Sequence, residues 1–294
     1  MVSYKKEDRL LNLVINVVLG LATIFAIYPL WYVLIASFSN PQNIATGKVL
    51  LFPVGFNASA YTKLFSDMRI WVGYKNSIFY TVVGTAISLA LTLPCAYALS
   101  RPRLPGRKIL SFFFVFTMYF SGGLVPSYLL LNSLKMLNTV WAVLLPGAVS
   151  SFNLIVARSF FESNIPEPLY ESATIDGASY IRFFFSFVIP LSKAVIAVLM
   201  LFYGLVQWNA YFAPMVYLQS RDLQPLQVVI AGITATLDAS VSETTSGAEL
   251  MRIIEERQLI KYSIVIVSAL PMFFVYPLVY RHFQKGIMIG AIKG

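Results

Sequence analysis

Long apolar stretches separated by shorter polar segments dominate the hydrophobic pattern of this chain. Six of them lie at about residues 11–37, 74–99, 109–131, 138–161, 194–218 and 260–280. Each is near or above the roughly 20 residues that a helix needs to cross a hydrocarbon core about 30 Å thick. Because lipid offers backbone polar groups no hydrogen-bonding partner, such segments must be helical. The pattern predicts an all-α integral membrane protein with six transmembrane helices in a single domain, 1–294.

The composition agrees with a membrane protein. Of the 294 residues, 58% are hydrophobic and 12% are charged, and the mean hydropathy is +0.73. A water-soluble domain of this length needs more charge to cover its surface. The first apolar stretch is too long for a signal peptide and lacks a small-residue cleavage site, so we expect a retained first helix.

The placement of charge predicts an orientation. The net charge is +9, and basic residues are dense in the short segment 101–108, RPRLPGRK. Placing the N-terminus inside puts most lysines and arginines on the cytoplasmic face, as the positive-inside rule requires. We therefore expect both termini in the cytoplasm, and we expect no nucleic-acid partner.

The apolar stretches lack the residues that most ion-driven transporters need. Their interiors contain no Asp or Glu, and the only histidine, His282, follows the last stretch. Coupling ions are usually carried by intramembrane carboxylates or histidines, although backbone carbonyls can also hold sodium. The sequence has no HExxH, no cysteine cluster and no GxxxxGK[ST] phosphate-binding pattern. We expect no catalytic residue, no metal site and no ATP hydrolysis by this chain alone.

Residues 162–193 form the longest predicted inner loop. Asn164 is the expected N-cap of a short helix, with Glu167 three positions later and Pro166 close to the first turn. Gly177 can adopt the left-handed conformation that ends a helix. We expect a helix, a bend and a second helix below the bilayer.

The second part of this loop is aromatic, and two readings of the whole loop stay open. The segment ASYIRFFFSFVI is expected to lie along the inner membrane surface until Pro190 and Lys193 begin the fifth span. An amphipathic loop resting on lipid is one reading. Acidic Glu167, Glu171 and Asp176 argue against it, because an anionic leaflet repels them. Small side chains favour a protein groove instead; they are Ser172, Ala173 and Ala178.

Residues 171–190, ESATIDGASYIRFFFSFVIP, resemble the EAA loop of binding-protein-dependent ABC importer permeases. That pattern runs E-A-A, three residues, G, nine residues, then I-x-L-P. The matching positions are Glu171, Ala173, Asp176, Gly177 and Pro190. Ser172 replaces the middle alanine, and Phe187 and Ile189 replace the isoleucine and the leucine.

Further segments resemble the carbohydrate branch of this family, whose members include the maltose permeases. They are YPLWYVLIASFS, FSGGLVPSYLL, QWNAYFAPM, LQPLQVV and the ending QKGIMIGAIKG. The resemblance covers nearly the whole chain, and it is strongest to permeases for complex oligosaccharides such as alginate or pectin fragments. It implies a type I ABC importer permease in the bacterial cytoplasmic (inner) membrane.

The resemblance also implies partners. They would be a second homologous permease, two ATPase subunits that bind ATP and magnesium, and an extracytoplasmic sugar-binding protein, with no cofactor in this chain. The residues that would contact an ATPase cleft are Glu171, Ser172, Ala173, Asp176, Gly177, Ala178 and Pro190. The tail 281–294 would supply a second contact through Lys285, Gly286, Gly290, Lys293 and Gly294. The alternative for that segment is a frayed surface tail.

Polar and small residues inside the spans are candidates for the sugar pathway. They are Gln207, Trp208, Asn209, Tyr211, Phe212, Gly122, Gly123 and Asn153. Aromatic faces and amides suit sugar rings and hydroxyls, and broken helices often line transporter cavities. The same residue types also join neighbouring helices, which is the alternative. The outer segments 39–72 and 219–259 are candidates for docking the binding protein.

The leading hypothesis is a permease subunit of an ATP-driven oligosaccharide importer. A second hypothesis is the same architecture importing another solute, such as a phosphorylated polyol or a peptide. A third is a membrane scaffold that anchors a cytosolic partner. An intramembrane enzyme is a distant fourth, because no catalytic constellation is present.

Overall fold

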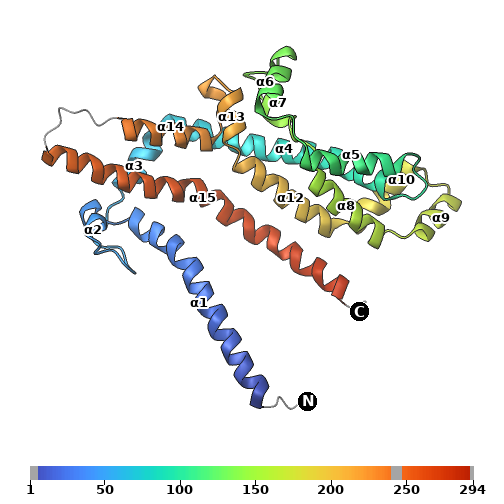
Figure 1. The fold of residues 1–294 in the computed structure, drawn as a ribbon, viewed down its shortest axis with the longest axis horizontal. Coiled ribbons are helices and arrows are strands. Elements are labelled where there is room, and N and C mark those ends of the chain that lie inside the picture. The colour runs from blue at the N-terminus through green and yellow to red at the C-terminus, as the bar shows by residue number, and fades with distance from the viewer. Residues whose placement is uncertain (1–5, 240–246, 292–294) are drawn as a thin grey trace. The chain divides into compact units, whose positions relative to one another are not determined.

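A computed structural model of the chain describes residues 6–239 and 247–291 (Figure 1). Within these ranges every regular element is a helix, which confirms the predicted all-α class. The chain divides into two compact units. One consists of Met1–Met68 with Gly232–Leu270, and the other of Arg69–Ala231 with Pro271–Gly294. The prediction of one domain over the whole chain stays a prediction.

The described residues of the first unit form whole helices near the N-terminus and parts of two later ones. They are α1 (Lys6–Ser37), α2 (Pro41–Ala45), α3 (Ser59–Ser66), and the matching parts of α14 (Leu226–Ala239) and α15 (Gly247–Ala291). Ile35 and Ala36 at the end of α1 pack with Ile44, Ala60 and Leu259 in a buried cluster. The most apolar part of α1 is not buried by the rest of the described chain. Such a surface is suited to lipid or another subunit.

The second unit contains the remaining helices. They are α4 (Met68–Ser100), α5 (Arg107–Tyr119), α6 (Leu124–Ser133), α7 (Trp141–Leu144), α8 (Ser151–Asn164), α9 (Glu167–Ile175), α10 (Tyr180–Phe183), the π-helix η1 (Phe184–Val188), α11 (Ile189–Leu191), α12 (Lys193–Trp208), α13 (Phe212–Tyr217) and the 3₁₀-helix η2 (Arg221–Leu223). In chain order, the predicted inner loop therefore runs from the end of α8 to the start of α12.

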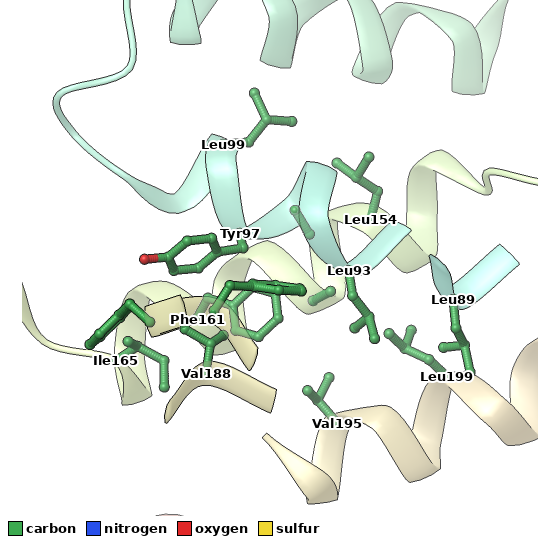
Figure 2. Packing of buried hydrophobic residues seen from close by; sticks show 14 of the residues in the cluster. Leu89, Leu93, Tyr97, Leu99, Leu154, Phe161, Ile165, Val188, Val195 and Leu199 are labelled. Carbon is green, nitrogen blue, oxygen red and sulfur yellow. The ribbon is translucent and has the colours of Figure 1, made fainter. Parts of the chain in front are cut away.

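Helices α4, α8 and α12 share the main core of the second unit. Leu93 and Tyr97 of α4 meet Phe161 of α8 and Leu199 of α12 (Figure 2). Phe161 and Leu199 are fully buried. A buried hydrogen bond of 2.7 Å joins the Thr92 hydroxyl of α4 to the Tyr203 hydroxyl of α12. This core packs α8 and α12, the helices on either side of the inner loop, against α4.

The predicted spans are less regular in the structure than in the sequence. Among the described residues, three helices are long and apolar enough to cross a membrane, and the number rises to five if each of two bent pairs is one span. The stretch 109–131 is not one helix, because α5 and α6 meet at 114°. The stretch 138–161 is also broken, between α7 and α8, where Gly147 has a φ of +77°. The count of six spans is not confirmed.

Candidate functional site

The start of α9 differs from the prediction. Asn164 is not its N-cap, because α8 continues to Asn164 and the Asn164 amide donates to the Phe160 carbonyl at 3.0 Å. The N-cap of α9 is Pro166, whose extended backbone leads into the helix without a side-chain cap. Glu167 lies in the first turn, where the positive end of the helix dipole favours a carboxylate.

The end of α9 is a Schellman motif centred on Gly177. Gly177 has a φ of +80°, and its amide donates to the Thr174 carbonyl at 3.0 Å. The next amide, of Ala178, donates to the Ala173 carbonyl at 2.9 Å. These two bonds satisfy carbonyls that the helix end leaves free. The bend after α9 therefore occurs at the glycine that the sequence singled out.

One face of α9 is bound to the core of the second unit. Tyr170 and Ala173 are buried, and the Tyr170 ring meets Phe183 edge-on with 5.3 Å between ring centres. Tyr170 also stacks on Tyr180 at 5.1 Å. The small Ala173 side chain therefore packs inside this chain, whereas the sequence reasoning assigned it to an ATPase contact.

The other face of α9 is exposed and combines acidic groups with one large apolar side chain. Glu171, Ser172 and Asp176 are exposed on it. Ile175, the last residue of the helix, is 87% exposed. The sequence reasoning missed Ile175, and its position four residues after Glu171 was the signal available. An exposed apolar side chain beside carboxylates is suited to a partner's groove.

The carboxylates of Glu167 and Glu171 have partners within the chain. Arg103 Nη2 lies 2.7 Å from Glu171 Oε1, and Arg103 Nε lies 3.3 Å from Glu167 Oε1. Arg101 Nη1 lies 3.3 Å from Glu167 Oε2. Sequence reasoning used the basic segment 101–108 only to orient the chain, so it missed these contacts. The Arg103 and Glu171 side chains are each more than half exposed, so a partner could replace this pair at a cost of about 1 kcal/mol or less.

A second group of ion pairs holds the ends of α5 and α8 together. Glu162 accepts from Arg107 and from Arg158, whose Nε lies 3.0 Å from Glu162 Oε1. Arg107 Nε also donates to the Leu99 carbonyl at 2.8 Å, at the end of α4. These contacts tie the start of α5 and the ends of α4 and α8 to one another.

Comparison with known proteins places this arrangement in a family. The chain is 38% identical over 291 residues to the polygalacturonan/rhamnogalacturonan transport system permease protein YtcP of Bacillus subtilis (strain 168), covering 98% of this chain and 100% of that protein. It is 37% identical over 289 residues to Protein LplC of the same organism, covering 98% and 97%. No family model matches the chain.

A solved structure agrees. The crystal structure of a bacterial ABC transporter involved in the import of the acidic polysaccharide alginate contains a similar chain, with a TM-score of 0.85 and 35% identity. The match covers 96% of this chain and 100% of that one. The chain belongs to the carbohydrate branch of the ABC importer permeases. It is a multi-pass membrane protein of that family.

The candidate pathway residues of this permease lie in different surroundings. Gln207 and Trp208 are buried. A Cβ added at Gly84 of α4 would lie 2.7 Å from Gln207 Nε2, so this amide fills the space that the glycine leaves. Asn209 is exposed, and its side chain donates to the Leu205 carbonyl at 2.8 Å. For Gln207 the contacts match the alternative of a helix-to-helix link.

The pathway role of every candidate, Gln207 included, stays a prediction. Tyr211 and Phe212 are exposed at the start of α13, and Gly122 and Gly123 form the break between α5 and α6. Asn153 is buried in α8, and its backbone N–H donates to the hydroxyl of the N-cap residue Ser150 at 3.4 Å.

The predicted tail contact falls at the end of α15, which runs to Ala291. Lys285, Gly286 and Gly290 belong to this helix, and only the helical course of their backbone is described. Lys293 and Gly294 lie outside the described residues altogether.

The predicted docking segments contribute to a polar cavity in the first unit. It has a volume of about 450 Å³. Its lining includes the ion pair of Lys63 with Glu256, together with Asn40, Gln42 and Glu255. Tyr61 is a sequence neighbour of the lining residues Ala60 and Lys63, and its hydroxyl lies 2.7 Å from the Ser37 hydroxyl. Burial raises the pKa of the Tyr61 phenol above its usual 10.0.

Proposed function

We propose that this chain is one of two permease subunits of an ATP-driven importer of oligosaccharides, with α9 as its coupling helix. The exposed face of α9 carries the proposal. It presents Glu171, Asp176 and the 87% exposed Ile175 on a helix whose opposite face is held in the core. Two ATPase subunits would bind ATP and magnesium, and this chain would be a non-catalytic part of the complex.

The mechanism follows from how α9 is held. An ATPase cleft that grips α9 moves when ATP closes the two ATPase subunits. The Schellman bend at Gly177 and the buried Tyr170 join α9 to α4, α8 and α12, so the helices follow this movement. Coupling of this kind is reciprocal, so sugar-loaded binding protein on the outer side promotes ATPase closure on the inner side. This scheme requires both termini in the cytoplasm, as the basic segment 101–108 favours.

Similarity to the relatives points to acidic oligosaccharides as the substrates of this permease. The similar permease of Bacillus subtilis is named for polygalacturonan and rhamnogalacturonan, and the similar structure belongs to a transporter of acidic alginate. Polygalacturonan and alginate are polymers of uronic acids. We infer that this permease imports uronic-acid oligosaccharides delivered by a binding protein.

Uptake into proteoliposomes tests the function. The permease is reconstituted with its second permease, its ATPase and its binding protein, and entry of labelled uronic-acid oligosaccharides is measured with ATP inside. The proposal predicts ATP-dependent uptake that unlabelled acidic oligosaccharides compete away and a peptide does not. In the Glu171→Gln variant, uptake falls while all subunits stay inserted, and Ser163→Ala, an exposed control at the end of α8, keeps wild-type uptake. Unchanged uptake by Glu171→Gln, or competition by peptide, would contradict the proposal.

A further inference from the structure

A second cavity lies beside the coupling segment, wholly within the second unit. Its volume is about 540 Å³, which is in the range of about 300–1,000 Å³ found for ligand pockets. Much of its wall is apolar, formed by Pro94, Ala98, Leu104, Pro105, Phe184 and Phe185. These residues come from the end of α4, the segment that follows it, and the π-helix η1. The cavity is therefore suited to a ligand with a long apolar part.

The same cavity has cationic groups in its wall. Arg101 and Arg103 both line it, and the Arg103 side chain is 64% exposed. Arginine binds phosphate oxygens with two parallel hydrogen bonds, so it is the residue best suited to a phosphate headgroup. A ligand that combines an apolar chain with an anionic head would match both parts of the wall.

Tyr97 is the most deeply buried of the polar side chains described in the wall of this cavity. It lines the cavity and is only 7% exposed, yet its hydroxyl has no hydrogen-bond partner among the described residues. In Figure 2 this hydroxyl points away from Leu89 and Leu93 of the core. The Arg101 guanidinium lies 4.8 Å from the centre of the Tyr97 ring. A buried phenol without a partner costs free energy, so the wall of the cavity is not fully satisfied at this residue.

We propose that this cavity binds an anionic phospholipid of the inner leaflet, with its phosphate on Arg101 and Arg103 and an acyl chain between α4 and η1. Tyr180, Ile181 and Phe185, which line the cavity and are exposed, are suited to the membrane interface. Basic pockets at the cytoplasmic ends of membrane helices bind anionic headgroups in this way.

Lipid binding would also affect α9. Arg103 holds Glu171 at 2.7 Å, and a phosphate competes with that carboxylate for the same guanidinium. An occupied cavity would therefore release Glu171 for the ATPase. This effect rests on the proposed function, whereas the lipid site itself does not.

Native mass spectrometry of the complex purified through a tag on this chain tests the site. The complex is titrated with phosphatidylglycerol and, separately, with neutral phosphatidylcholine. We expect Arg103→Gln to weaken phosphatidylglycerol binding about fivefold, the effect of one basic residue at an anionic surface. Ala98→Phe, which fills the cavity, also weakens it. Lys108→Gln removes an equal charge from an exposed position that does not line the cavity, so it leaves binding unchanged.

Three results would overturn the proposal. The first is that phosphatidylcholine binds as tightly as phosphatidylglycerol. The second is that both Arg103→Gln and Ala98→Phe bind phosphatidylglycerol as the wild type does. The third is that the Ala98→Phe complex loses the ATPase but retains the lipid. The last result would mean that a protein segment occupies the cavity. Because lipid binding is read by mass, a failure of sugar uptake leaves this measurement intact, so the two proposals fail separately.

Discussion

Replacing Gly177 with alanine perturbs the bend at the end of α9 with little other change. No atom lies within 4 Å of the added Cβ, so the cost is conformational rather than steric. A side chain in the left-handed region costs about 1–2 kcal/mol. Leaving that region instead would break the bonds from the amides of Gly177 and Ala178, each worth about 0.5–1.5 kcal/mol. Either way the bend loses about 1–2 kcal/mol, a factor of about 5–30 in its local equilibrium.

Gly106 offers a matched control. It has a φ of +73° at the N-cap of α5, and no atom lies within 4 Å of an added Cβ. Gly106→Ala therefore carries a similar conformational cost without altering the end of α9. In proteoliposomes we expect Gly177→Ala to lower sugar uptake per ATP hydrolysed by up to about 5–30-fold, while Gly106→Ala keeps the wild-type ratio. Equal losses in both variants, or an unchanged ratio in Gly177→Ala, would refute the reasoning.

Three further predictions concern stability, measured by thermal unfolding of the purified complex. In Gly84→Val the new Cβ would lie 2.7 Å from Gln207 Nε2, so Gln207 must move and the free energy of unfolding falls by about 1–3 kcal/mol. A wild-type melting temperature would contradict this packing. Lys63→Met breaks an exposed ion pair with Glu256, so it costs about 1 kcal/mol or less, with a smaller loss at high salt. Burial raises the pKa of Tyr61 in the folded state, so the stability that this residue contributes is complete below pH 10.0 and falls as the pH rises further. The Tyr61→Phe variant should lose less stability at high pH than the wild type. Identical stability–pH profiles of the two proteins would contradict this prediction.

Local signals in the sequence predicted the end of α9 but not its start. A left-handed cap depends on one residue, so Gly177 could be recognised without knowledge of the fold. The start depended on where the preceding helix stops. Because α8 continues through Asn164, that residue bonds back to Phe160 and cannot cap the next helix. Two adjacent helices thus competed for one polar residue, and the pattern alone did not decide between them.

The tertiary contacts of the site could not be predicted from sequence. Arg103 and Glu171 are 68 positions apart, and they meet because the end of α4 and α9 pack on one core. Likewise, the contact between Gln207 and Gly84 depends on how α12 crosses α4. Sequence reasoning identified Gln207 as unusual in an apolar helix, but its surroundings come from packing. The same holds for Ala173, whose small size serves the core of this chain.

Cysteine cross-linking at the tip of α9 tests the central claim most directly. Cys95 is the only cysteine, so Cys95→Ser followed by Ile175→Cys places a single thiol at a position of α9 that is 87% exposed. Ser163→Cys, at an exposed position near the end of α8, is the control. The account predicts that the thiol at position 175 cross-links to the ATPase and is protected from maleimide in the complex, with protection that changes on ATP binding. Equal labelling at position 175 with and without the ATPase, and no cross-link, would contradict it.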